Sequence, residues 1–331
     1  MEKQSGKSGN NFWKDKRVFI TGGTGFIGSW LVNKLVELNA NVFCLSEKQL
    51  NEKSNFILLG LNKQVKLING NVLDFELLNK TIKENEIEVV FHLAAQPLVQ
   101  VAIKNPVETL KINIIGTANV LEACRLNNVK STVVASTDKA YGEGQVPYKE
   151  DYCLNAKYPY DVSKSCADLI AGMYGKTYKL QIGIARFTNT YGPGDFNFDR
   201  IVPETIKSLI EGNDIKIRSN GKFKRDFIYV KDVVNAYLVL AEKTQELKLE
   251  GDAFNFGSGN PVLMIDLVNK ILEFSGNKKS KINILNQVKS EIKDSYVSIE
   301  KASKILGWKP EYGLEQGLKE TFKWYEKYFK L

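Results

Sequence analysis

Residues 17–28 read RVFITGGTGFIG, a short apolar run that leads directly into a turn with three evenly spaced glycines. The run predicts a strand, and a helix is expected after the turn because apolar residues recur there at helical spacing: Trp30, Leu31, Leu35 and Leu38. Such a turn lets the main chain approach a pyrophosphate, whose charge lies at the helix N-terminus. No Gly-Lys-Ser/Thr follows, which excludes a P-loop. The spacing therefore predicts a dinucleotide-binding turn at Gly22, Gly25 and Gly28.

The alternation of strand and helix continues through the first 190 residues. Apolar β-rich runs predict further strands at 41–46, 65–69, 89–93, 131–135 and 182–186. Helical patterns lie between them at 75–83, 106–127 and 160–180. Alternation of this kind predicts an α/β fold with a doubly wound parallel sheet of the Rossmann type, covered by helices on both faces.

The domain organisation follows from where this alternation weakens. We expect a disordered tail over 1–11 and a dinucleotide-binding domain over 12–190, with segments near 226–260 returning to it. A smaller, discontinuous substrate-binding region is expected from the remainder, 191–225 and 261–331, with a helix over 201–211 and a hairpin-like stretch around 216–227.

Composition excludes several classes of protein. The chain has 331 residues, 43% hydrophobic and 25% charged, as in ordinary globular proteins. It has no apolar run long enough for a membrane span, and its N-terminus lacks the apolar core of a secretory signal, so we expect a cytoplasmic protein that does not bind membranes. The net charge of +8 is compatible with nucleic acid, but the lysines are spread along the chain without a basic arm, so we expect no nucleic-acid partner. An anionic small substrate explains the charge equally well, and so does solvated surface.

Cysteine and histidine content limits the chemistry further. The four cysteines show no CxxC spacing and are expected to be reduced thiols. A zinc site or a serine–histidine–aspartate triad would depend on one imidazole, His92, which lies between Phe91 and Leu93 in a predicted strand. We therefore interpret His92 as a strand residue and expect no metal site.

Tyr160 and Lys164 stand four residues apart, on one face of a predicted helix. The lysine charge favours the phenolate; bringing a tyrosine pKa from about 10 towards neutrality requires roughly 4 kcal/mol, which Lys164 and a nicotinamide cation together could supply. Such a pair arises often by chance in a chain with 14 tyrosines. Because it follows a dinucleotide turn by well over a hundred residues, it is the strongest catalytic candidate.

The choice between NAD and NADP depends on the end of the second strand. An acid there normally binds the adenosine ribose of NAD, and this chain has Ser46, followed by Glu47. The choice stays open on these residues, but no arginine lies nearby to hold a 2′-phosphate, which favours NAD.

Seven motifs, in order, resemble the extended short-chain dehydrogenases that remodel nucleotide-linked sugars: TGGTGFIG, HLAAQ, the Asn-x-x-Gly-Thr of residues 113–117, STDKAYG, YPYDVSK, RFTNTYGPG and RDFIYVKDV. The similarity covers nearly the whole chain from Phe12. It implies an enzyme that uses NAD on a nucleotide-diphosphate sugar and a homodimer formed by helices 106–127 and 160–180. It also implies cofactor contacts from Phe26, Ile27, Ser46, Asn71, Val72, Ala94, Ala95 and Gln96.

The loop after the fifth strand separates subgroups of this family. Epimerases usually have Ser-Ser-small there, whereas 4,6-dehydratases place an acid and a base beside the threonine; here the loop reads Thr137-Asp138-Lys139. This variant most resembles the CDP-glucose 4,6-dehydratases. The glycine turn departs from that subgroup, which often has His and Lys where this chain has Gly23 and Ile27, so the resemblance specifies the reaction more closely than the nucleotide.

By this resemblance, Tyr160 takes the proton of the sugar 4-hydroxyl, Thr137 hydrogen-bonds that hydroxyl and Lys164 holds the phenolate and the nicotinamide ribose. Lys139, directly or through water, and Asp138 handle the carbon-5 proton and the departing 6-hydroxyl. The substrate diphosphate is assigned to Asn189, Arg200 and Arg225. Three alternatives remain: a 4-epimerase, a non-catalytic NAD-binding protein, and a reading of Asp138 and Lys139 as a solvated ion pair.

Overall fold

A computed structural model describes residues 12–47, 50–277, 279–287 and 292–330, so the predicted tail over 1–11 lies outside the described residues. The chain divides into two compact units. The first holds the described residues up to Ala135 with Tyr158–Ala185 and Tyr237–Ala253, and the second holds Ser136–Lys157, Arg186–Ala236 and the described residues from Phe254 onward. The domain bounds expected from the sequence remain a prediction.

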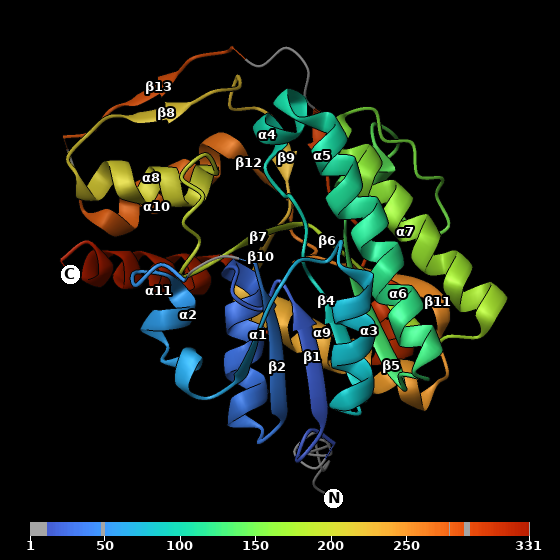
Figure 1. The fold of residues 1–331 in the computed structure, drawn as a ribbon. Helices are drawn as coiled ribbons and strands as arrows, with labels where there is room; N and C mark the ends of the chain where they lie inside the picture. The colour runs from blue at the N-terminus through green and yellow to red at the C-terminus, as the bar shows by residue number, and fades with distance from the viewer. Residues whose placement is uncertain (1–11, 48–49, 278, 288–291, 331) are drawn as a thin grey trace, which may run out of the picture. The chain divides into compact units, whose positions relative to one another are not determined.

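A seven-stranded sheet forms the centre of the fold, in the order β11-β6-β5-β4-β1-β2-β3 (Figure 1). The chain starts in the middle of the sheet and winds outward both ways, and the pairs β1–β2, β2–β3, β1–β4 and β4–β5 are parallel. The predicted doubly wound α/β fold is confirmed. Its strands are β1 (Arg17–Thr21), β2 (Asn41–Ser46), β3 (Lys66–Asn69), β4 (Val89–His92), β5 (Ser131–Thr137), β6 (Ile182–Phe187) and β11 (Glu250–Phe256).

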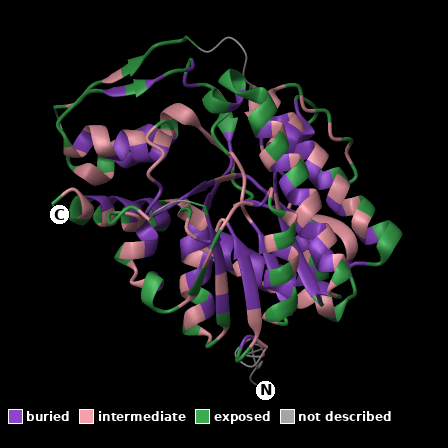
Figure 2. Cartoon of the chain, in the orientation of Figure 1, coloured by how far each residue is buried: buried purple, intermediate pink, exposed green. Residues whose placement is uncertain are grey.

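Helices cover both faces of this sheet because its strands are apolar on both sides. Val90 of β4 packs in a core cluster with residues of α3 (Phe75–Glu84) and α6 (Gly116–Leu126). The next residue, Phe91, points to the opposite face and contacts Tyr237 of α9 (Val230–Glu246). Gly23 lies against Val32 of α1 (Phe26–Glu37). Figure 2 shows the strands buried between these layers.

Two long helices follow the sequence prediction closely. The first runs without a break from Pro106 to Leu126, through α5 (Pro106–Leu110), a π-helical segment (Lys111–Ile115) and α6. The second, α7 (Pro159–Tyr178), begins with proline and ends where Lys179 adopts a left-handed backbone. A π-helical turn inside an α-helix often marks a functional position, and here it contains Asn113.

The second unit is built from shorter elements. β7 (Asn189–Tyr191) pairs in parallel with β10 (Phe227–Tyr229). The helical elements in this part of the chain are η3 (Asp138–Tyr141), α8 (Ile201–Ile210), α10 (Met264–Ser275), η4 (Ala302–Leu306) and α11 (Leu314–Tyr328). In the first unit, the remaining short helices are α2 (Asn55–Leu58), η1 (Leu61–Lys63) and α4 (Val99–Lys104).

The hairpin predicted around 216–227 is wrong. β8 (Ile215–Ile217) pairs in parallel with β13 (Ile282–Ile284) instead of with the strand that follows it. That strand, β9 (Lys224–Arg225), lies between β12 (Val262–Leu263) and β14 (Asp294–Ser295). Strands of two or three residues offer too few ladder bonds for a stable hairpin, so each takes partners from distant segments.

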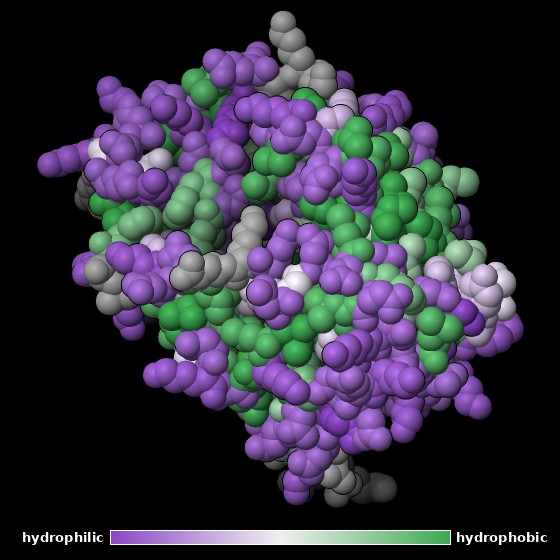
Figure 3. Space-filling model, viewed as in Figure 1, coloured by the Kyte–Doolittle hydropathy of each residue, from purple (hydrophilic) through white to green (hydrophobic). Residues whose placement is uncertain are grey.

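The helices from α5 to α7 leave a set of apolar side chains exposed, which we call the α6–α7 face: Val107, Ile115, Leu126, Leu169, Met173 and Tyr178. The space-filling view shows hydrophobic side chains gathered over this part of the molecule (Figure 3). Among the described residues, no helix combines the length and the apolar character that crossing a bilayer requires.

Candidate active site

The glycine turn after β1 has a backbone that only glycine accommodates. Gly22 has a φ of 74°, and a Cβ there would lie 2.7 Å from the backbone nitrogen of Ala94. A Cβ on Gly28 would lie 2.1 Å from the carbonyl oxygen of Gly22. At Gly22 the turn is therefore packed directly against the loop that follows β4, and at Gly28 it is packed against its own first residues, so a side chain at either glycine would distort the turn.

The N-terminus of α1 fits a phosphate group. Its N-cap residue is Gly25, no side chain caps the first turn, and that turn carries no acidic residue. The backbone N–H groups of Phe26, Ile27 and Gly28 thus begin a helix whose own first turn places no carboxylate at the positive end of its dipole. This arrangement suits the pyrophosphate of a dinucleotide.

The end of β2 provides a carboxylate one residue later than the usual position. Glu47 follows Ser46, and its Oε1 accepts a hydrogen bond of 2.8 Å from Asn71 Nδ2. Gly70 N–H donates to the Ser46 carbonyl at 3.1 Å, which keeps the ends of β2 and β3 together. Glu47 is therefore the acidic group available to a ribose at this edge. Val72 is buried and packs against Gly116.

A buried chain of hydrogen bonds connects β1 and β4 to α7. Thr117 Oγ1 donates to the Asn113 carbonyl at 2.6 Å, so it accepts from His92 Nε2 at 2.9 Å. His92 Nδ1 is then the acceptor for Thr21 Oγ1 at 2.7 Å. Asn113 Nδ2 in turn bonds Ser163 Oγ at 2.8 Å, and Ser163 donates to the carbonyl of Tyr160 at 2.6 Å.

This chain fixes His92 as a neutral imidazole at the end of β4, which confirms the interpretation of His92 as a strand residue. Burial, with a smaller contribution from the charge of Lys164, lowers the pKa of His92 to about 3. Because the unfolded chain takes up this proton near its usual pKa of 6.5, acid favours the unfolded state from about pH 6.5 downward.

We expect the single histidine to show this directly. In the folded protein its NMR signals should not titrate between about pH 7.5 and about pH 5, whereas in urea they should titrate near the ordinary histidine pKa. As the pH falls from about 6.5, His92 alone should lower the free energy of unfolding by about 1.4 kcal/mol per pH unit, down to its folded-state pKa of about 3. A titration midpoint near pH 6.5 in the folded protein, the ordinary value, would contradict the assignment.

Tyr160 and Lys164 occupy successive turns of α7, as predicted. Tyr160 is the second residue of the helix and is half-buried, whereas Lys164 is buried. Lys164 Nζ donates to the carbonyl oxygen of Ala135 in β5. Burial lowers the pKa of Lys164 to about 8, opposed in part by the negative charge of Asp168. Lys164 is thus a desolvated ammonium, one helical turn after Tyr160 in α7.

The second unit contains Thr137, Asp138 and Lys139 at the end of β5. Asp138 is 1% exposed, and its Oδ1 and Oδ2 accept hydrogen bonds from Thr137 Oγ1 at 3.2 Å and Ser295 Oγ at 2.7 Å. Lys139 Nζ lies 4.0 Å from Asp138 Oδ1, with its side chain 36% exposed. This geometry argues against the reading of Asp138 and Lys139 as a solvated ion pair, because the carboxyl is inside the protein.

The three residues assigned to the substrate diphosphate have different environments. Asn189 Nδ2 donates to the carbonyl of Asp226 at 3.3 Å. Arg225 is buried, and its guanidinium donates to the main-chain carbonyls of Lys224, Ile292 and Lys293. Arg200 precedes α8 and pairs with Asp195 at 3.2 Å, with its side chain 41% exposed. Arg200 is therefore the more accessible of the two arginines.

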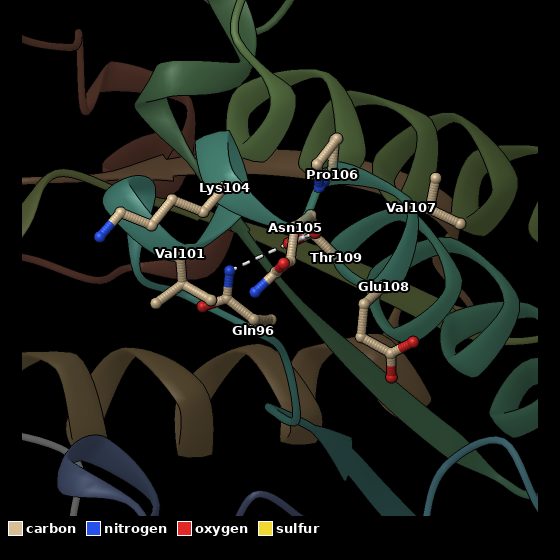
Figure 4. A pocket seen from close by; sticks show the side chains of 8 residues that line it. All are labelled: Gln96, Val101, Lys104, Asn105, Pro106, Val107, Glu108 and Thr109. Atoms are coloured by element: carbon tan, nitrogen blue, oxygen red, sulfur yellow. Dashed lines mark hydrogen bonds between the residues drawn. The ribbon is translucent and has the colours of Figure 1, made fainter.

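Gln96 links the loop after β4 to the helices above it. Its backbone N–H donates to Asn113 Oδ1 at 2.7 Å and its side chain donates to Thr109 Oγ1 at 3.0 Å. It also lines a pocket of about 440 Å³ at the junction of α4 and α5 (Figure 4). Among the predicted cofactor residues, Gln96 alone lines this pocket, so the pocket does not define the dinucleotide site.

Sequence reasoning missed three residues that organise the site. Ser163 bridges Asn113 to Tyr160, and Ser295 bonds Asp138 across 157 positions of sequence. Asp226 accepts from Ser258 N at 3.0 Å and Gly259 N at 3.3 Å, beside the substrate candidate Asn189. Ser163 could have been found from its place inside the Tyr-x-x-x-Lys motif; Ser295 has no local signal.

A doubly wound sheet with a glycine turn after its first strand and a Tyr-x-x-x-Lys pair on a long helix defines the class of extended short-chain dehydrogenases. More narrowly, the chain belongs to the GDP-mannose 4,6 dehydratase family, whose sequence model matches residues 19–321.

Its relatives include both dehydratases and epimerases. CDP-glucose 4,6-dehydratase of Salmonella typhimurium is 32% identical and aligns with 97% of this chain and 93% of that protein. The structure of UDP-glucose 4-epimerase from Thermotoga maritima, solved with UDP-glucose, has a TM-score of 0.87 at 29% identity, covering 95% of this chain and 99% of that one. The structure of dTDP-glucose 4,6-dehydratase from Bacillus anthracis, solved with NAD, has a TM-score of 0.84 at 28% identity. The match covers 94% of this chain and 97% of that one.

Proposed function

We propose that this chain is an NAD-dependent nucleotide-sugar 4,6-dehydratase that converts an NDP-hexose, with CDP-glucose as the best candidate, to the NDP-4-keto-6-deoxyhexose. The observation that carries the proposal is Asp138, a buried carboxyl held beside Thr137 and Lys139. Oxidation at carbon 4 needs no acid at this position, whereas elimination of water does.

The glycine turn, Glu47 and Lys164 are the groups that hold NAD in this proposal. The uncapped N-terminus of α1 takes the pyrophosphate and Glu47 takes the adenosine ribose. When bound, NAD supplies the acceptor for the hydrogen of carbon 4 and returns it at carbon 6. Glu47 is held by a hydrogen bond from Asn71, and no arginine lies next to it in sequence to bind a 2′-phosphate. The end of β2 therefore favours NAD over NADP.

The chain's own residues move the protons. Tyr160 takes the proton of the 4-hydroxyl while Thr137 orients that hydroxyl, and the charge of Lys164 favours the phenolate. The resulting ketone acidifies carbon 5. Lys139, as a neutral amine or through a water, takes the carbon-5 proton, and the electron pair of that C–H bond forms the carbon 5–carbon 6 double bond. Asp138 gives its proton to the 6-hydroxyl, whose C–O bond breaks as water leaves. When the hydrogen is returned to carbon 6, the electron pair of the carbon 5–carbon 6 double bond takes a proton at carbon 5, which Lys139 gives back directly or through the water.

The substrate diphosphate is assigned to Arg200, Asn189 and Arg225. Arg200 offers an accessible guanidinium, and phosphate binds such a planar fork in a bidentate manner. Arg225 would have to exchange main-chain carbonyls for phosphate oxygens, so we propose a smaller contribution from it.

A 4-epimerase is the second candidate, favoured by the likeness to the Thermotoga maritima enzyme. Incubation with a panel of NDP-hexoses separates the two. A dehydratase gives a product lighter by one water that absorbs in alkali, and an epimerase gives an isomer of unchanged mass. Dehydration of the CDP sugar in preference to UDP and dTDP sugars is the expected result, and an isomer alone would overturn the proposal.

We also propose a homodimer formed through the α6–α7 face, whose most exposed members are Val107 at 64% and Leu169 at 63%. An apolar face of this kind is costly in water and is buried by a second copy under twofold symmetry. Val107→Lys with Leu169→Lys should convert a dimer to a monomer in light scattering at micromolar protein, with unchanged circular dichroism. Leu247→Lys with Ile305→Lys, two exposed residues outside the segment from α5 to α7, is the matched control. A monomeric wild-type protein would contradict the dimer.

A further inference from the structure

We propose that Ser295 is a positioning residue for Asp138, one that fixes which oxygen of the carboxyl delivers the proton to the leaving 6-hydroxyl. This inference rests on the dehydratase function proposed above. It deepens that function by assigning a role to a residue that lies far in sequence from every motif of the site, although it contacts Asp138 in the folded protein.

The contact between the two side chains is short and enclosed. Ser295 Oγ donates to Asp138 Oδ2 at 2.7 Å, and the two residues are 4% and 1% exposed. The other oxygen, Oδ1, faces Thr137 Oγ1 at 3.2 Å and Lys139 Nζ at 4.0 Å. The two oxygens are therefore distinct: Ser295 occupies Oδ2, and Oδ1 lies on the side of the two residues assigned to the sugar.

The hydroxyl of Ser295 is itself held in place by the main chain around it. Ser295 ends β14, which pairs with β9, and its carbonyl accepts from Asp226 N–H at 3.4 Å. Tyr148 N–H donates to the carbonyl of the next residue, Tyr296, at 2.9 Å. Arg225 binds the carbonyl of Lys293 at 2.6 Å. Because these hydrogen bonds hold the main chain at Ser295 in place, its hydroxyl can keep the Asp138 carboxyl in one rotamer.

The charges around Asp138 make this hydrogen bond important. Lys139 is the cation beside it, and the buried carboxyl of Asp226 and the phenol of Tyr148 also interact with it. Asp226 is already bonded to Ser258 and Gly259. A second buried carboxyl near Asp226 needs hydrogen-bond partners of its own, because a buried polar group without a partner is costly. Ser295 is the donor that Asp138 receives from outside its own loop.

The effect should appear in the chemical step and not in binding. As the Asp138 O–H bond breaks and its proton passes to the 6-hydroxyl, negative charge develops on the carboxyl, and a hydrogen bond to a charged oxygen is stronger than one to a neutral oxygen. An interaction that strengthens only as the reaction proceeds raises kcat and leaves KM unchanged. Misplacement of the acid also slows the step.

The test compares Ser295→Ala with the conservative Ser295→Thr. For Ser295→Ala we expect kcat for dehydration to fall about 10- to 100-fold with KM unchanged, and a 4-keto-hexose that still carries oxygen at carbon 6 to be trapped by borodeuteride quenching. Ser295→Thr, which keeps a hydroxyl, should restore most of the rate. Ser298→Ala is the matched control, because it removes a nearby serine hydroxyl that accepts its hydrogen bond from the N–H of Glu300.

A double-variant cycle distinguishes positioning from general structural damage. In an Asp138→Asn background, Ser295→Ala should slow dehydration no further, since its effect acts through the carboxyl. Additive losses, or a Ser295→Ala rate equal to that of the wild type, would overturn the Ser295 assignment while the wild type still dehydrates. If the wild type dehydrates no hexose in the panel, the proposed function fails and this assignment fails with it.

Discussion

In an Asp138→Asn, Lys139→Met double variant, we expect oxidation at carbon 4 to survive while loss of water stops. Oxidation uses Tyr160, Thr137 and Lys164, none of which is changed. Elimination needs a proton removed from carbon 5 and another given to the 6-hydroxyl, and the double variant lacks both groups. Rate losses of about 10²- to 10⁴-fold are typical when acid–base groups are removed. Borodeuteride quenching should then trap the 4-keto-hexose in place of the 4-keto-6-deoxyhexose.

The matched control for this variant is Glu143→Gln with Lys157→Met. These two residues form an ion pair of 4.0 Å whose side chains are 65% and 61% exposed, so the control makes the same change of charge at a solvated pair. It should dehydrate at the wild-type rate. A double variant at Asp138 and Lys139 that also dehydrates at the wild-type rate would remove the main support for a dehydratase and leave the epimerase.

The parts of the fold that the sequence predicted are those specified by neighbouring residues. The first strands and the helices over 106–127 and 160–180 have periodic apolar patterns, and their observed ends lie within two residues of the predicted ones. The glycine turn is specified just as locally, because Gly22 and Gly28 pack on backbone where no Cβ fits. The position of Tyr160 and Lys164 on successive turns of one helix could be predicted from their spacing of four residues.

The parts that sequence reasoning missed depend on residues far apart in the chain. β8 and β9 are separated by six residues in sequence, yet their partners come from β13, β12 and β14, so a local pattern suggested a hairpin that does not form. The contact between Ser295 and Asp138 was missed for the same reason, because the two residues lie 157 positions apart in the sequence. The carbonyl partners of Arg225 at Ile292 and Lys293 are also distant in sequence and had no local signal, and its assignment to the substrate diphosphate stays a prediction.

Tyr160→Phe should abolish both half-reactions while leaving the fold intact. The phenylalanine ring keeps the packing of a half-buried aromatic residue and removes the oxygen that takes the 4-hydroxyl proton. The hydrogen bond from Ser163 to residue 160 is made to the carbonyl and survives the change. We expect dehydration to fall by at least about 10²-fold, the scale of a general base, with a thermal unfolding midpoint close to that of the wild type.

This variant differs from the one at Asp138 and Lys139 in where the reaction stops. Without the base at carbon 4 no ketone forms, carbon 5 is never acidified, and hydrogen at carbon 5 should not exchange with solvent deuterium. Tyr178→Phe, an exposed tyrosine at the end of the same helix, should exchange and dehydrate as the wild type does. If Tyr160→Phe still exchanges deuterium at carbon 5 at the wild-type rate, another group takes the 4-hydroxyl proton, and the desolvated ammonium of Lys164 acts on something other than this phenol.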